Sequence, residues 1–141
     1  MAAFNKFNQF VEDVAEKVHN LGADTLKVLL TNTAPAATNA VKADLTEISA
    51  GNGYTAGGTA ATISSSSQTS GTYKLVLADV VFTASGGSIG PFRYAVLYND
   101  TPTSPADPLI GWWDYGSALT LNAGETFTVD FSPTNGVLTL V

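Results

Sequence analysis

The fold is decided by the stretch FRYAVLY, residues 92–98. Large side chains occupy every second position in it, and successive residues of a β-strand point to opposite faces of the sheet. Aromatic and β-branched residues favour the pleated, half-buried surface of a sheet. We therefore expect a central strand with one aromatic face, formed by Phe92, Tyr94, Val96 and Tyr98.

Further strands are predicted on both sides of this stretch. In TLKVLLT, residues 25–31, Leu29 interrupts the alternation, which indicates a largely buried strand. In YKLVLADVVFT, residues 73–83, the alternation changes phase, which a β-bulge near Ala78 and Asp79 or burial of both faces would explain. The remaining strands are expected in LIGWWDY (109–115), TFTVDF (126–131) and VLTLV (137–141).

Six to eight such strands, separated by turn residues and without alternating helices, predict a mainly β fold. We expect an antiparallel β-sandwich or a jelly-roll-like barrel. With 141 residues, the chain is expected to form a single domain. Within it we expect an N-terminal helix in residues 1–22 and a β domain in residues 23–141, with a long loop over residues 32–58.

The N-terminal segment carries the one helical pattern. Its apolar residues recur at steps of three and four, which predicts one amphipathic helix of about 15 to 18 residues ending at Gly22. Two roles for this stripe are open: it packs on its own sheet, or its three Phe residues reach a neighbouring subunit. The stripe consists of Phe4, Phe7, Val11, Val14, Val18 and Leu21, and Phe10 lies beside it.

Residues 32–58 are rich in Ala, Thr, Asn and Gly. Loops of this length inside a compact domain commonly serve a function. Tyr54, inside the glycine-rich GNGYTAGG of residues 51–58, is expected to anchor the loop on the core or on a partner. No Lys-Ser or Lys-Thr pair follows these glycines, so a phosphate-binding loop is not expected.

Composition limits the classes of partner. Six basic residues are scattered among twelve acidic ones, giving a net charge of −6, so we expect no nucleic-acid binding. No stretch approaches the roughly 20 apolar residues of a membrane span, and no membrane association is expected. Only 13% of the residues are charged and 45% are hydrophobic, a composition that suits a surface packed against other protein.

No constellation of reactive side chains stands out. The chain has no Cys and a single His, His19, so we expect no metal, no cofactor, no catalytic residue and no enzymatic activity. In the strand of residues 109–115, Trp112 and Trp113 must point to opposite faces of the sheet. Sugar rings stack on indoles, so these residues with Asp114 keep open an alternative, a carbohydrate-binding module.

Six stretches resemble small virion structural proteins of tailed bacteriophages: FNQFVED (7–13), HNLG (19–22), LTNTAP (30–35), AGNGY (50–54), AVLYND (95–100) and LNAGETF (121–127). The resemblance implies a capsid decoration or cement protein, made in the host cytoplasm and located in the virion. Such a protein binds the major capsid protein as a homo-oligomer, a dimer or trimer, and stabilises the shell. A tail or baseplate component is the alternative within the same class.

For such a protein we expect the contacts with its partner in two segments, residues 2–21 and the loop of residues 32–58. An outward indole of the strand at residues 109–115 is expected to add to them. The predicted partner-binding residues are Phe4, Phe7, Phe10, Tyr54 and Trp112.

Overall fold

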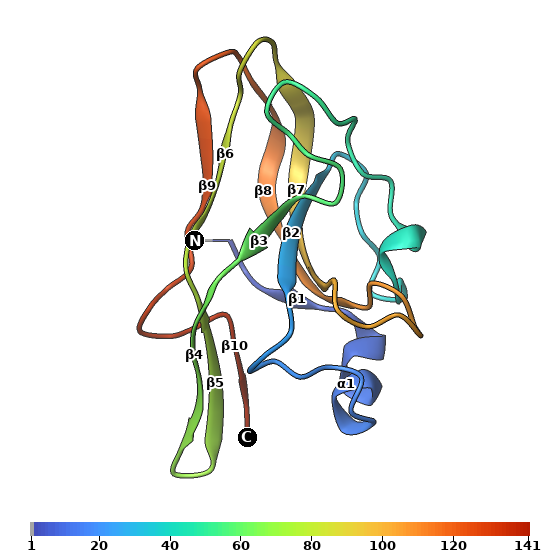
Figure 1. The fold of residues 1–141 in the computed structure, drawn as a ribbon, viewed down its shortest axis with the longest axis vertical. Helices are drawn as coiled ribbons and strands as arrows, with labels where there is room; N and C mark the ends of the chain where they lie inside the picture. Colours follow the sequence, from blue (N-terminus) through green and yellow to red (C-terminus); the bar gives the residue numbers. More distant parts are fainter. Residues whose placement is uncertain (1) are drawn as a thin grey trace.

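A computed structural model describes residues 2–141 as a mainly β protein with one short N-terminal helix. The strands form two layers that face each other (Figure 1). The elements are β1 (Asn5–Lys6), α1 (Asn8–Ala15), β2 (Leu26–Thr31), the 3-10 helix η1 (Lys42–Asp44), β3 (Thr59–Ala61), β4 (Ile63–Thr69), β5 (Thr72–Leu77), β6 (Val80–Thr83), β7 (Ile89–Asn99), β8 (Leu109–Leu121), β9 (Thr126–Val129) and β10 (Leu138–Leu140).

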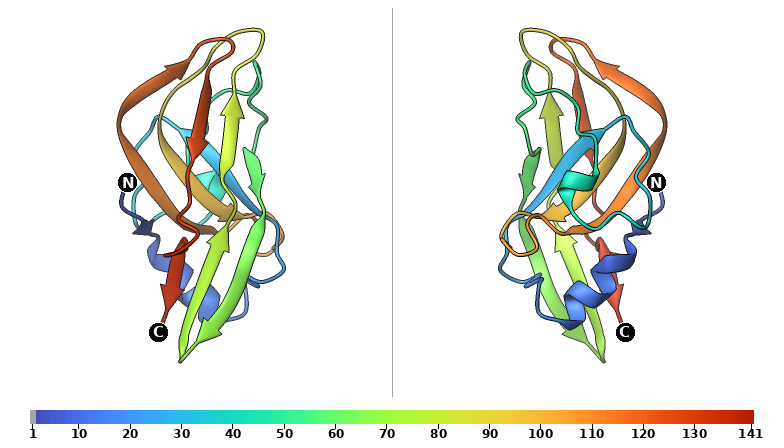
Figure 2. Two further views of the ribbon diagram at one scale, coloured as in Figure 1. Left: turned by 90° about the vertical axis from the view of Figure 1, so that its left-hand side faces the viewer. Right: turned by 90° about the vertical axis from the view of Figure 1, so that its right-hand side faces the viewer.

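One layer is a five-stranded sheet in the order β1-β8-β7-β2-β3. The other consists of two smaller sheets, β10-β5-β4 and β6-β9, which follow one another along its length (Figure 2). All paired strands are antiparallel. The arrangement is sandwich-like, as the sequence predicts, and β7 lies centrally between β2 and β8.

The change of phase in residues 73–83 has a different cause from the predicted bulge within one strand. The segment forms two strands, β5 and β6, which belong to different sheets of the second layer. Ala78 and Asp79 join them, and both residues are exposed. The chain changes sheet at this point, so residues of different parity reach the main core. These are Leu75 and Leu77 before the crossing and Val80 after it.

The expected aromatic face of β7 is divided between the two sides of the sheet. Phe92 lies in the main core between the layers, together with Ala95 and Leu97. Val96 and Tyr98 lie in a second cluster on the outer face of the sheet. The register between β7 and β8 shifts between Phe92 and Tyr94, and this shift turns Phe92 to the side opposite to its predicted partners.

The segment of residues 32–58 covers the outer face of the five-stranded sheet (Figure 2). Leu45 packs there on the second cluster, which contains Leu29 and Tyr98. The Tyr98 hydroxyl donates a hydrogen bond to the carbonyl of Gly57 (2.6 Å), and Lys42 Nζ lies 5.4 Å from the centre of the Tyr98 ring. This cover explains why β2 is buried on both faces.

The N-terminal helix is shorter than the stripe predicts. Residues Asn5 and Lys6 are extended and pair with Trp112 and Gly111 at the edge of β8, so α1 has only eight residues. Backbone hydrogen bonds to an open sheet edge stabilise the extended form here. At the other end Lys17 adopts a left-handed backbone (φ 68°), which ends the helical path before Val18 and Leu21.

Candidate functional site

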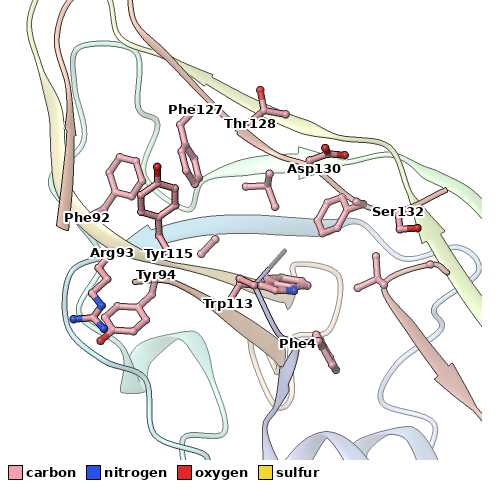
Figure 3. Close-up of a pocket in the computed structure, with 16 residues that line it drawn as sticks. Phe4, Phe92, Arg93, Tyr94, Trp113, Tyr115, Phe127, Thr128, Asp130 and Ser132 are labelled. Atoms are coloured by element: carbon pink, nitrogen blue, oxygen red, sulfur yellow. The ribbon is translucent and has the colours of Figure 1, made fainter. Parts of the chain in front are cut away.

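A pocket of about 460 Å³ opens between the five-stranded sheet and β9 (Figure 3). Sixteen of residues 2–141 line it, and seven of these are aromatic, so we call it the aromatic groove. The rings come from the N-terminal arm, from β7 and β8, and from β9 with the segment that follows it. Six of them belong to Phe4, Phe92, Trp113, Tyr115, Phe127 and Phe131. The ring of the seventh, Tyr94, lies beside Arg93 and away from these six (Figure 3).

The rings form two groups within the groove. In one, Trp113 lies between Phe4 and Phe131, with ring centres 5.4 and 5.5 Å apart. In the other, Phe127 contacts Phe92 at 5.0 Å and Tyr115 at 5.6 Å, both edge to face. Such pairs contribute about 0.5–1.5 kcal/mol beyond the area that they bury, so the walls of the groove are held in place without a ligand.

A bulge in β8 shapes the rim. Asp114 lies opposite Tyr94 and Leu119 lies opposite Phe92, so the four residues 115–118 of β8 face a single residue of β7. Gly116 has a left-handed backbone (φ 103°), and its N–H donates to Asp114 Oδ1 (2.8 Å). The bulge holds Tyr115 at the edge of the groove, where 55% of its surface is exposed.

Two strand edges border the groove without a strand partner among residues 2–141. On its outer edge β8 pairs with β1 only at Gly111 and Trp112, and its later residues have no strand beside them there. β9 pairs with β6 alone, and residues 127–132 all line the groove. In an antiparallel pair, alternate residues point their N–H and C=O groups away from the partner strand. The groove therefore offers main-chain hydrogen-bonding groups beside the aromatic rings.

The charges near the rim are paired. Arg93 donates from Nε and Nη2 to the two carboxylate oxygens of Asp114, at 2.8 and 3.0 Å. The bond from Arg93, together with the one from Gly116, lowers the pKa of Asp114 below its usual range. A carboxyl group held in this way is a poor proton donor, so Asp114 does not fit the role of a general acid. Asp130, which is exposed, is the carboxylate in the lining of the groove.

Three of the predicted partner-binding residues are core residues in this structure. Phe7 is fully buried with its ring 4.6 Å from that of Trp112, and Phe10 is 2% exposed in the main core. Tyr54 is also 2% exposed; its hydroxyl donates to Glu47 Oε1 (2.7 Å) and accepts from the N–H of Leu30 (3.0 Å). We therefore correct the partner-binding prediction for these three side chains, which contact their own chain. Of the alternatives that the sequence left open, Phe7 and Phe10 pack within the chain, and Tyr54 anchors its loop on the core.

The other two predicted residues remain partly exposed. Phe4 lies in the aromatic groove against Trp113. Trp112 and Trp113 pack on opposite sides of the sheet, as predicted, Trp112 on the second cluster and Trp113 on the main core. It is thus Trp113 that faces the groove, and Trp112 does not line it.

The groove as a unit was not predicted from the sequence. The signal for it was a set of aromatic residues in three separate segments, at residue 92, at residues 113 and 115, and at residues 127 and 131. Which of these strands face one another depends on the topology, which the pattern alone does not give.

Residues 2–141 hold neither a cluster of metal-ligating side chains nor a membrane-spanning helix. No group of three or more His, Asp or Glu residues there is placed to hold a metal ion. No helix in that range is long and apolar enough to cross a membrane. Comparison with models of protein families, with curated proteins and with solved structures found no match to the chain.

Proposed function

We propose that this chain is a virion structural protein of a tailed bacteriophage, a capsid decoration protein that binds the major capsid protein and stabilises the shell. The six stretches that resemble such proteins support the class. The aromatic groove supports a binding role, and it is the observation that carries the proposal: aromatic rings and open strand edges together are suited to a polypeptide partner.

The groove would take an extended segment of the capsid protein. A strand added at an open edge gains main-chain hydrogen bonds, and pockets beside it select the side chains of the added strand. Here Trp113 and Tyr115 stand beside the open edge of β8. Arg93 and Asp114 neutralise one another, which leaves Asp130 to attract a basic residue in the added segment.

The proposed oligomeric state follows from the repeated arrangement of capsid subunits on a shell. A homo-oligomer, dimer or trimer, would bind several capsid subunits at once, and linked contacts of modest strength combine into tight binding. The location proposed for the protein is the virion, and its partner there is protein; nucleic acid and membrane have no part in the proposal.

A second candidate, a carbohydrate-binding module, is favoured by the same groove. Trp113 and the exposed ring of Tyr115 could stack on sugar rings, with Thr128, Asp130 and Ser132 as hydrogen-bonding groups. A tail or baseplate component is the further alternative; it shares the binding mode and differs in the partner.

The test compares Tyr115→Ala with Val81→Ala. Both side chains are about half exposed, 55% and 50%, but Val81 lies on β6 outside the groove, which makes it a matched control. Truncating an aromatic anchor at an interface typically costs about 2 kcal/mol. We expect Tyr115→Ala to weaken binding to shells of the major capsid protein by about 30-fold, and Val81→Ala to leave it unchanged. A deletion of residues 2–11 is unsuitable, because it removes Phe7 and Phe10 from the core.

The alternatives give other results. Equal binding by both variants, or no binding to shells, contradicts the proposal. Imaging of intact virions with labelled protein then separates shell from tail. Binding of glycans that is lost in Tyr115→Ala, without binding to shells, would support the carbohydrate-binding module in its place.

A further inference from the structure

The chain's one histidine lies in a buried cluster outside the aromatic groove. His19 is 8% exposed and belongs to the segment that connects α1 to β2. Its Nδ1 lies 3.1 Å from Nδ2 of Asn99, the last residue of β7, which is fully buried. The ring of Phe10 on α1 packs against the imidazole at 5.2 Å. The cluster thus ties the N-terminal segment to the central strand.

The orientation of the Asn99 amide is fixed by two other hydrogen bonds. Its Oδ1 accepts from the N–H of Thr101 (3.1 Å), and its Nδ2 donates to Asp24 Oδ2 (2.7 Å). Asp24 Oδ2 also accepts from the N–H of Asn20 (2.8 Å). Turning the amide over would place a donor against Thr101 and an acceptor against Asp24, so the NH₂ group must be the side that faces His19.

This orientation decides the protonation of His19. An amide NH₂ only donates, so Nδ1 must accept the bond from Asn99 and carry no proton. The neutral ring then holds its proton on Nε2. Nε2 is buried without a hydrogen-bond partner, and so is Oδ2 of Asp13, which is 4% exposed. One is a donor and the other an acceptor, and both are unpaired among residues 2–141.

We propose that His19, Asn99 and Asp24 form a proton-sensitive clasp, in which uptake of a proton at His19 Nδ1 breaks the bond to Asn99 and releases the segment of residues 16–25 from the end of β7. A protonated Nδ1 is a donor that faces the donating NH₂ of Asn99. The amide cannot turn to accept this proton without losing its bonds to Thr101 and Asp24. The fold therefore opposes the charged ring by geometry as well as by burial.

The groups around the ring set the direction of the effect. Burial is the largest influence on the pKa of His19 and lowers it below the usual 6.5, whereas Asp13 on α1 and Asp24 before β2 raise it by less. A pocket of about 540 Å³ borders His19 and gives solvent a path to it. The other titratable groups that line this pocket are Lys17 and, on β5, Tyr73. Because the released form takes up the proton more readily, the clasp is at full strength above pH 6.5 and weakens as the pH falls below it.

Two measurements on the whole chain test the clasp. The ¹⁵N shifts of the His19 ring at pH 7.5 report the tautomer directly, and we expect the Nε2–H form. Hydrogen exchange of the amides of residues 16–25 should show protection factors that fall by as much as about tenfold per pH unit below pH 6.5, with no such fall for β7 or β2. An Nδ1–H tautomer, a pKa of 6.5 or higher, or protection unchanged at pH 5 overturns the proposal.

His19→Asn is the control variant that keeps the hydrogen bond from Asn99 and removes the titrating group. Its Oδ1 can accept from Asn99 in the position of Nδ1, but the side chain does not titrate. We expect protection of residues 16–25 in this variant to be independent of pH between 7.5 and 5. If the variant loses protection over the same range as the native chain, another group is the sensor and the proposal is wrong. The tautomer measurement needs no variant, so it decides the question even if His19→Asn folds poorly.

Discussion

The carboxylate of Asp79 accepts a hydrogen bond from the backbone N–H of Phe131 at 2.9 Å. Asp79 stands where the chain leaves β5 for β6, and Phe131 where it leaves β9 for β10. The bond therefore ties together the two crossings between the small sheets of the second layer. It also places Phe131 against Trp113 in the aromatic groove.

The first prediction concerns this bond. Asp79→Ala leaves the N–H of Phe131 without its acceptor, and we expect the free energy of unfolding to fall by about 1 kcal/mol. Asp79→Asn retains an acceptor oxygen and should lose less than half as much. Urea unfolding measures both variants. Equal losses would show that the charge of Asp79, and not its hydrogen bond, matters at this crossing.

The same crossing shows what the sequence could predict and what it could not. Alternation within each strand comes from the two-residue period of the sheet, so the strands and the mainly β class were predictable. The period carries no information on which sheet a strand joins, and two strands at residues 73–83 therefore resembled one strand with a bulge. The presence of Asp79 in an apolar run marked the irregularity without giving its geometry.

The predicted length of the N-terminal helix was wrong for a related reason. Its spacing of apolar residues fits a helix from Phe4 onward, but β8 has an open edge that pairs with Asn5 and Lys6. Such pairing is a tertiary contact that overrides the local pattern. Phe4 is half-buried in the groove, and its contact with a partner stays a prediction. Phe7 is buried because its extended segment inserts it beside Trp112.

The second prediction tests the anchor of the long loop. Tyr54→Phe removes the hydroxyl that accepts from the buried N–H of Leu30 and donates to Glu47. A buried donor left without a partner costs about 1–3 kcal/mol, and thermal unfolding should show a loss of this size. Tyr115→Phe removes an exposed hydroxyl and should change stability by less than about 0.5 kcal/mol. Similar effects in both variants would contradict the anchoring role of Tyr54.

The third prediction concerns alkaline pH. Burial raises the pKa of both Tyr54 and Tyr98 above the usual value of 10.0. The unfolded chain therefore releases these protons at a lower pH than the folded chain. Their stabilising effect is complete below pH 10 and is lost as the pH rises above it, by about 1.4 kcal/mol per pH unit for each residue.

Unfolding by urea between pH 8 and 11 measures this dependence. We expect the slope of stability against pH above pH 10 to be smaller in Tyr54→Phe than in the native chain, because one of the two buried phenols is absent. A slope unchanged by that substitution would mean that Tyr54 ionises while the chain is still folded.

The last prediction concerns the lower end of the aromatic groove, where the ring of Phe4 lies on Gly111. A Cβ at Gly111 would overlap this ring and stand 2.8 Å from the carbonyl oxygen of Asn5, closer than real Cβ atoms approach. Gly111→Ala should displace Phe4 and β1 from β8, at a cost of about 1–3 kcal/mol in stability. Fluorescence of Trp113, which loses its contact with Phe4, should shift toward that of a solvated indole.

A double-mutant cycle with Phe4→Ala separates this effect from general strain. Both substitutions remove the same contact between Phe4 and the groove, so the loss of stability in the double variant should be smaller than the sum of the two single losses. Additive losses would mean that the alanine at position 111 acts through the backbone of Asn5 alone. In that case Phe4 would keep its contact with Trp113 in the groove.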